Sequence, residues 1–156
     1  MHRRSLLAAP LLLSPALGSR PAAAHDVAAG ELTIARPWSR AAGAGGTGAG
    51  YLTIVNRGAA ADRLVSASSP AARKTELHTH MREGEVMRMR EVPGIEIPPG
   101  QSVAFAPGGL HVMLVGLTQA LQAGTTVPLT LVFERAGPVQ VELHVEAAGA
   151  RGPSAH

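Results

Sequence analysis

The sequence contains no cysteine, and this absence narrows the chemistry that the protein can perform. No disulfide can brace the fold, so the hydrophobic core must stabilise it alone. No thiolate is available as a nucleophile or as a metal ligand. Any binding of a soft metal therefore falls to methionine thioethers and histidine imidazoles, and the chain has five Met and seven His.

The sequence also lacks an apolar run long enough to span a membrane, and the apolar stretch near its start is too short to do so. Two arginines open the chain, the run LLAAPLLLSPAL follows at residues 6–17, and small residues follow at 21–24. This order is typical of a secretory signal peptide. We predict cleavage after Ala24, which makes His25 the first mature residue and places the protein in the periplasm. No cysteine stands at the junction, so we expect no membrane anchor.

Once residues 1–24 are set aside, the chain has no excess of charge of either sign. This segment carries three of the 14 Lys and Arg residues and no acid, which leaves 11 basic and 11 acidic side chains. The balance excludes electrostatic binding to nucleic acid or to an anionic membrane surface. The remaining 132 residues are the length of one domain and suffice to bury a core.

Helical stripes of ten or more residues are absent too. The chain consists of short runs of alternating apolar residues, and Gly, Pro or Asp stands in the connections between them. This pattern predicts an all-β sandwich or barrel in a single domain, residues 25–147, followed by a disordered tail at 148–156. We expect strands at residues 31–35, 51–55, 62–68, 74–81, 85–90, 101–106, 110–117, 126–134 and 138–146.

Two of these strands gather histidine and methionine in the stretch HTHMREGEVMRMR, residues 78–90. Alternation puts His78 and His80 on one face of the first strand, and Met87 and Met89 on one face of the next. Methionine in a strand is most often a core residue. After the initiator, however, methionine occurs only beside the clustered histidines, and this favours a role in ligand binding.

A third strand carries the same two residue types. His111 and Met113 share a face of the run LHVMLVGL, and only Leu110 separates His111 from PGG, so we expect His111 near the start of its strand. His144 differs, because it alternates with polar residues and belongs to a solvated face. Thioether sulfur is soft and adds little for Zn²⁺, Mg²⁺ or Ca²⁺, whereas a mixed His and Met set favours Cu(I) and still tolerates Cu(II).

The spacing His-x10-Met-x21-His-x-Met, formed by His78, Met89, His111 and Met113, resembles the motif of the PCuAC (DUF461) family of periplasmic copper chaperones. The flanking stretches GELTIARPWSRA, YLTIVNRG and PGGLHVMLVGL are similar to this family in the same order. The resemblance implies a cupredoxin-like Greek-key β-sandwich in which these four residues hold Cu(I) near one edge. It implies a carrier of copper, not an enzyme.

By the same resemblance, the protein delivers copper to the binuclear centre in subunit II of cytochrome c oxidase, or to a Sco-like partner with a thioredoxin fold. His80, Met81 and Met87 fall outside the motif, and the resemblance assigns them no role, so we keep them as candidate auxiliary residues of the site. Some members carry a second, Cu(II) site in a His- and Met-rich tail, for which this chain offers only His156.

The sequence alone is also compatible with other functions. The protein could buffer copper or confer resistance instead of delivering it. His25, as a mature N-terminus, could bind copper through its α-amine and imidazole as in histidine-brace oxygenases. Electron transfer of the blue-copper type normally needs a Cys thiolate, which this chain lacks. A metal-free β-sandwich that binds other proteins is the last alternative.

Overall fold

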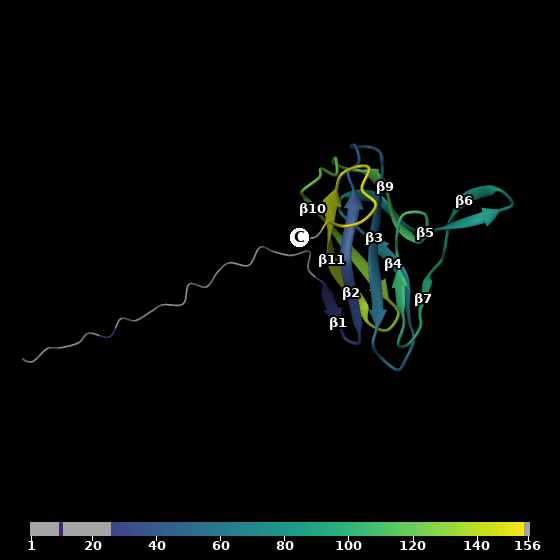
Figure 1. Ribbon diagram of the computed structural model, residues 1–156, viewed down its shortest axis with the longest axis vertical. Helices are drawn as coiled ribbons and strands as arrows, with labels where there is room; N and C mark the ends of the chain where they lie inside the picture. Colours follow the sequence, from purple (N-terminus) through teal and green to yellow (C-terminus); the bar gives the residue numbers. More distant parts are fainter. Residues whose placement is uncertain (1–9, 11–25, 155–156) are drawn as a thin grey trace, which may run out of the picture.

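The structure, a computed structural model, describes residue 10 and residues 26–154 (Figure 1). Apart from residue 10, the predicted signal peptide lies outside the described residues, and so do His25 and His156. No helix in the described part of the chain is long and apolar enough to span a bilayer. The described residues form eleven strands: β1 (Val27–Ala29), β2 (Leu32–Arg40), β3 (Thr47–Asn56), β4 (Asp62–Ser68), β5 (Ala72–Glu83), β6 (Val86–Glu91), β7 (Ile95–Ile97), β8 (Ser102–Ala104), β9 (His111–Leu117), β10 (Thr126–Phe133) and β11 (Gly137–Glu146).

The strands form one continuous sheet that folds over on itself. Its order is β6-β5-β9-β3-β2-β11-β10-β4-β7, with β1 paired to β2 and β8 paired to β3. The β11–β2 pair is parallel, and the other pairs are antiparallel. The last strand of the order, β7, lies close to β3 in the middle of the sheet. The Asn56 side chain of β3 donates a hydrogen bond to the carbonyl of Ile97 in β7 at 3.1 Å. The predicted all-β sandwich in a single domain is thereby confirmed.

The core lies between the two layers and is built from alternate residues of the strands. Ile34, Ile54, Leu114, Leu129 and Leu131 are fully buried there. Each such side chain contributes roughly 1.5–3 kcal/mol through removal from water. Side chains of a strand alternate between its two faces. Leu114 of β9 faces the core, so its two neighbours in the strand face the outer side of the sheet.

Strand β2 continues past the point at which the sequence predicts its end. Arg36 has a φ of 53°, and the register with β3 shifts between Ala35 and Trp38, which marks a bulge. Pro37, which has no N–H to donate, falls within this bulge. The strand then resumes pairing and carries Trp38 and Arg40 to the end of β3 that adjoins β9.

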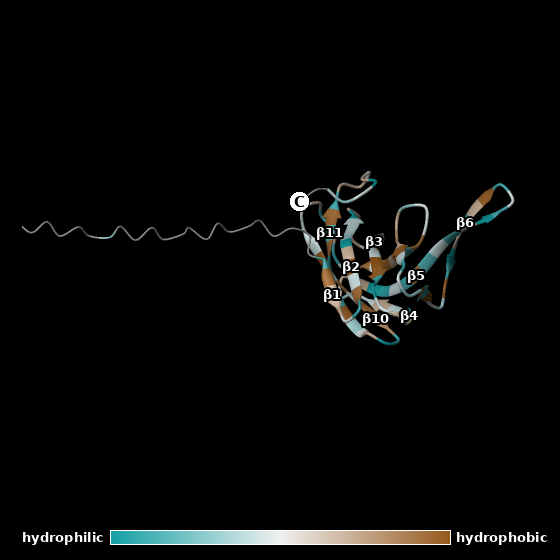
Figure 2. Ribbon diagram, turned by 60° about the horizontal axis from the view of Figure 1, so that its bottom comes forward, coloured by the Kyte–Doolittle hydropathy of each residue, from teal (hydrophilic) through white to brown (hydrophobic). Residues whose placement is uncertain are grey.

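The β5–β6 hairpin stands away from the sandwich (Figures 1 and 2). Every residue of β6 is exposed, and β6 is the terminal strand of the sheet. Met87 is 56% exposed and Met89 is 52% exposed. These methionines are therefore not core residues, which removes the packing explanation for their presence.

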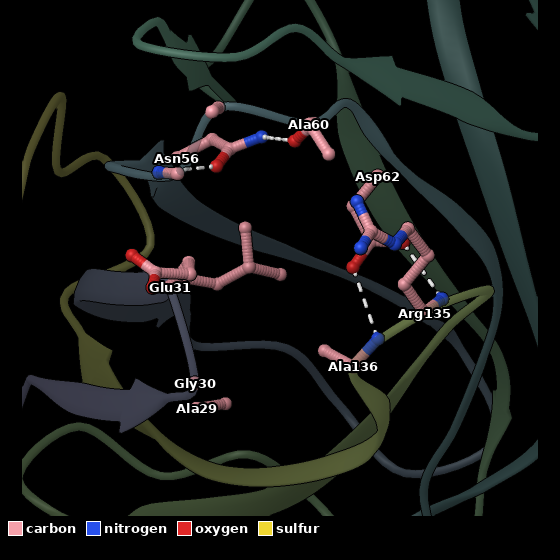
Figure 3. Close-up of a pocket in the computed structure, with 11 residues that line it drawn as sticks. Ala29, Gly30, Glu31, Asn56, Ala60, Asp62, Arg135 and Ala136 are labelled. Atoms are coloured by element: carbon pink, nitrogen blue, oxygen red, sulfur yellow. Dashed lines mark hydrogen bonds between the residues drawn. The ribbon is translucent and has the colours of Figure 1, made fainter.

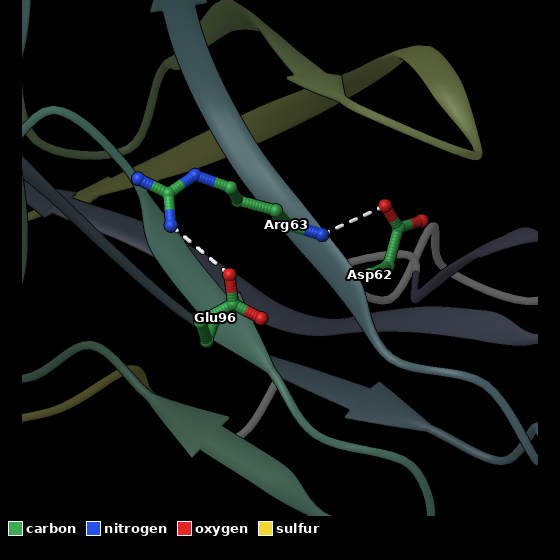
Figure 4. A network of polar contacts seen from close by, with 3 residues as sticks. All are labelled: Asp62, Arg63 and Glu96. Atoms are coloured by element: carbon green, nitrogen blue, oxygen red, sulfur yellow. Dashed lines mark hydrogen bonds and ion pairs between the residues drawn. The ribbon is translucent and has the colours of Figure 1, made fainter.

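A polar cluster fixes the opposite end of the sandwich. The Asp62 carboxylate accepts hydrogen bonds from the backbone N–H groups of Arg63, Arg135 and Ala136 at 2.8, 2.9 and 3.0 Å. Figure 3 shows this carboxylate beside a hollow of about 440 Å³. The Arg63 guanidinium also pairs with Glu96 at 3.0 Å (Figure 4). The cluster joins β4, β7 and the β10–β11 turn.

The segment after β11 folds back along the sandwich. The carbonyl of Ala150 accepts a hydrogen bond from Arg40 Nε at 2.7 Å, and the N–H of Ser154 donates to Glu146 Oε1 at 3.0 Å. The sequence predicts disorder from residue 148 onward, and residues 148–154 of that tail make these contacts. They bring the tail next to the end of β2.

Candidate metal centre

Three neighbouring strands bring the histidines and methionines of the motif to one face of the sheet. His78 in β5 lies directly opposite His111 in β9, and His80 lies directly opposite Met89 in β6. Met113 lies opposite Glu76, two positions further along β5 and β9. Residues directly opposite in an antiparallel pair point to the same side, so these side chains share the outer face of the sheet.

A cavity of about 290 Å³ opens where these side chains meet. Four potential copper ligands contribute to its wall: His80, Met89, His111 and Met113. Arg40 and Tyr51 close it on the side of β2 and β3. His78 is not part of this wall, although its ring centroid lies 5.6 Å from that of His111; the corresponding distance for His80 is 5.3 Å.

His111 is held as a neutral, oriented imidazole. It is only 3% exposed, and its Nδ1 lies 3.1 Å from the carbonyl oxygen of Gly109. A carbonyl can only accept, so Nδ1 carries the proton and Nε2 keeps a free lone pair. Burial lowers the pKa of His111, the nearby His80 and His78 lower it further, and the hydrogen bond to Gly109 partly opposes them. A neutral imidazole is the form that binds a metal.

The turn before β9 sets the position of His111. Gly108 has a φ of 84°, a conformation that residues with a Cβ rarely adopt. The N–H of Gly109 then donates to the carbonyl of Ala106 at 2.9 Å and closes the turn. The strand starts at His111, one residue after the predicted start at Leu110.

His78 contacts the carboxylate of Glu76, a residue that is not among the predicted site residues. Its Nε2 lies 2.6 Å from Glu76 Oε2, and the other oxygen of Glu76 lies 2.6 Å from Lys74 Nζ. The hydrogen bonds from Lys74 and His78 lower the pKa of Glu76, and the hydrogen bond to Glu76 raises the pKa of Lys74. His78 Nδ1 is buried and has no hydrogen-bond partner among the residues that the structure describes. The spacing of Glu76 and His78, two apart on one strand, is the sequence signal for this pair.

Met81 and Met87 occupy different places from Met89. Met81 points to the other face of β5, where its sulfur lies 3.7 Å from Arg90 Nη1. Met87 shares the face of Met89 but lies opposite Arg82, two positions nearer the tip of the hairpin. The structure thus brings Met89 to the cavity and leaves Met81 and Met87 outside its wall.

The donor set determines which metal the centre suits. Within the described residues, no group of three or more His, Asp or Glu side chains could hold a metal ion by themselves. The thioethers of Met89 and Met113 lie in the wall of this cavity beside the imidazoles of His80 and His111. Two imidazoles and two thioethers form a neutral, soft set that suits Cu(I) and adds little for hard divalent cations.

The fold is a small all-β domain, and a cavity lined by His and Met side chains lies on its outer face. The chain belongs to the family described as "Putative lipoprotein LpqE-like", which matches residues 32–145. A putative lipoprotein of Leifsonia xyli subsp. xyli, Lxx21020, is 37% identical over 101 residues, or 64% of this chain and 60% of that protein. The match thus spans about 60% of the length of this curated relative.

Solved structures similar to this chain include PCuAC domains. The copper-bound PCuAC domain from PmoF2 is 34% identical, with a TM-score of 0.68, and the match covers 79% of this chain and 98% of that domain. The Cu(I) form of DR1885 from Deinococcus radiodurans is 28% identical, with a TM-score of 0.57, and the match covers 72% and 78% of the two chains. PCuAC domains have a cupredoxin-like β fold, so this part of the predicted fold class is confirmed as well.

Proposed function

We propose that this protein is a periplasmic copper chaperone that binds Cu(I) through His78, Met89, His111 and Met113. The observation that carries the proposal is the cavity on the outer face of β5, β6 and β9, where Met89, His111 and Met113 converge. The relatives support it, since two of the similar domains are described as copper-bound or as the Cu(I) form. The description of the family and of its curated relative as lipoproteins supports export.

In this proposal the two histidines of β5 have different tasks. His78 completes the ligand set, in agreement with the motif spacing and with its position directly opposite His111. His80 lines the cavity next to Met89 and acts as an auxiliary residue through which copper passes. Imidazole accepts both copper states, so the site also tolerates Cu(II), although its two thioethers favour Cu(I).

Release of copper follows from the exposure of the site. Met89 is 52% exposed on a terminal strand, so a ligand of an acceptor protein can replace its weakly bound sulfur first. Exchange of one ligand at a time moves Cu(I) without a change of oxidation state and without a thiolate. We propose subunit II of cytochrome c oxidase, or a Sco-like protein with a thioredoxin fold, as the acceptor.

A competition titration with a Cu(I)-specific chelator tests the site. The variants His78→Ala and Met113→Ala are expected to lose affinity for Cu(I). Removal of a residue that hydrogen-bonds to a metal ligand typically weakens binding by roughly 10–100-fold, and removal of a ligand itself should weaken it more. His144→Ala, on β11 and away from the cavity, serves as the matched control. If either site variant bound Cu(I) as the unaltered protein does, the proposed ligand set would be wrong.

Delivery is tested separately from binding. The Cu(I)-loaded protein is mixed anaerobically with the metal-free copper domain of the oxidase subunit or with a metal-free Sco-like protein, and the copper content of both is measured after separation. Transfer to one of them supports a chaperone. If the acceptor binds Cu(I) at least as tightly as this protein does and all copper nevertheless stays on this protein, the result would indicate a copper buffer.

A further inference from the structure

The two ring nitrogens of His78 are in opposite situations. Nε2 lies 2.6 Å from Glu76 Oε2, whereas Nδ1 is buried and has no hydrogen-bond partner within residues 26–154. Buried polar atoms are normally paired, because leaving one unpaired loses its interaction with water without replacement. An unpaired nitrogen next to a candidate metal centre therefore needs an explanation.

The carboxylate determines which nitrogen carries the proton. An ionised Glu76 can only accept hydrogen bonds, so in the neutral imidazole of His78 the proton is on Nε2 and the lone pair is on Nδ1. Lys74 Nζ holds the second oxygen of Glu76 at 2.6 Å and keeps the carboxylate in place. The unpaired atom is thus the one with the free lone pair.

The opposing histidine has the reverse arrangement. His111 Nδ1 donates to the carbonyl of Gly109, which leaves the lone pair on Nε2. His78 and His111 are direct partners in the β5–β9 pair, with ring centroids 5.6 Å apart. Each ring is therefore fixed by one hydrogen bond and keeps one nitrogen available, and the available nitrogens differ.

We propose that Glu76 is a positioning residue for copper: it holds His78 in the Nε2–H form, so that Cu(I) is bound by Nδ1 of His78 and by Nε2 of His111. The inference rests on the proposed function and specifies the donor atoms of that site. An outer carboxylate commonly fixes the tautomer and orientation of a metal-binding histidine. Binding of Cu(I) would then use the lone pair that is otherwise buried without a partner.

The Glu76–His78 pair is less exposed to solvent than an ordinary surface ion pair. The side chains of Glu76 and His78 are 14% and 13% exposed. In the Arg63–Glu96 pair at the far end of the sandwich, the two side chains are 35% and 62% exposed. A sheltered hydrogen bond restrains the imidazole far more than an exposed one, which water competes with.

Long-range ¹H–¹⁵N NMR of the uniformly labelled protein, before and after anaerobic addition of Cu(I), tests the assignment. Before addition, His78 is expected as the Nε2–H tautomer with a proton protected from exchange, and His111 as the Nδ1–H tautomer. Cu(I) is expected to shift the Nδ1 resonance of His78 and the Nε2 resonance of His111. Loss of the Nε2 proton of His78 on addition of Cu(I), as coordination at Nε2 requires, would overturn the proposal.

Substitutions of Glu76 separate positioning from folding. Glu76→Leu is expected to lose the protected proton of His78 and to weaken Cu(I) binding by about 10–100-fold. Glu76→Gln keeps the size and one acceptor oxygen, so its affinity is expected to lie between those of Glu76→Leu and the unaltered protein. Glu96→Gln, which removes the charge from the exposed pair, is the control and is expected to bind Cu(I) normally.

The results also distinguish failure of this inference from failure of the proposed function. Normal Cu(I) affinity and an unchanged His78 proton in Glu76→Leu would overturn the positioning role while leaving the copper site intact. If Cu(I) shifted no resonance of His78, His80 or His111, the copper site itself would be wrong and the inference would fall with it.

Discussion

His78 and His111 lie directly opposite each other on β5 and β9, with ring centroids 5.6 Å apart and ring planes inclined by 35°. They are 33 positions apart in the sequence, and only the antiparallel pairing of the two strands brings them together. The same pairing puts Met113 beside Glu76, and the β5–β6 hairpin adds Met89. The candidate centre is therefore a product of strand register.

The buried His111 predicts a dependence of stability on pH. Burial lowers the pKa of this residue in the folded protein below its usual value of 6.5. Between the two values the unfolded chain binds the additional proton, so the free energy of unfolding of the metal-free protein should fall as the pH falls below 6.5. One proton contributes at most about 1.4 kcal/mol per pH unit.

Denaturant unfolding at pH 7.0, 6.0 and 5.0 measures this effect. The variant His111→Gln should show a smaller decrease over the same range, because it lacks the titrating group. A decrease that is the same in both proteins would contradict the assignment of the effect to His111.

Met87 and Met89 form a matched pair for testing the sulfur ligands. Both are on the same face of β6 and are exposed to nearly the same extent, 56% and 52%. Replacement of either by Leu should change the free energy of unfolding by no more than about 0.5 kcal/mol. Only Met89→Leu should weaken Cu(I) binding in a chelator competition. Equal losses in both variants would place Met87 at the site as well.

Met113 and Leu114 separate metal binding from packing. They are neighbours in β9 but face opposite sides of the sheet, and Leu114 is completely buried. Leu114→Ala should lower the free energy of unfolding by about 2–5 kcal/mol and leave one Cu(I) bound per folded molecule. Met113→Leu should do the reverse, with weaker Cu(I) binding and nearly unchanged stability. Urea unfolding and metal titration of both variants measure the contrast.

Asp62 should affect stability alone. Its carboxylate accepts three backbone hydrogen bonds at the end of the sandwich away from the cavity. Asp62→Ala leaves these N–H groups without their acceptor and should cost about 1–3 kcal/mol in the free energy of unfolding. Its Cu(I) affinity should match that of the unaltered protein. A loss of affinity in a variant that remains folded would show that the two ends of the sandwich are coupled.

Much of the fold was predictable from alternation and turn residues. The strands that carry the candidate ligands lie close to the predicted ranges, and β9 starts at His111, one residue after its predicted start. The strands β1 and β7, of three residues each, were not predicted, whereas β8, which is equally short, lies within the longer run predicted at 101–106. The continuation of β2 through a bulge at Arg36 was not predicted either, because Pro37 looks like the end of a strand.

The candidate site was predictable in its residue types and spacing, and the choice of ligands stays a prediction. Sequence alternation placed His78 and His80 on the same face, but it could not show that His80 would line the cavity and that His78 would bind Glu76. Nor could it indicate that Arg40 and Tyr51 close the cavity, because they arrive through the register of β2 and β3. These features depend on side-chain conformation and on contacts between distant strands.

X-ray absorption spectroscopy of the protein loaded anaerobically with one equivalent of Cu(I) tests the central claim most directly. The metal should have two sulfur and two nitrogen neighbours, and one sulfur should disappear in Met113→Leu. Coordination by nitrogen and oxygen alone, or a failure to bind Cu(I), would contradict the proposed His and Met site.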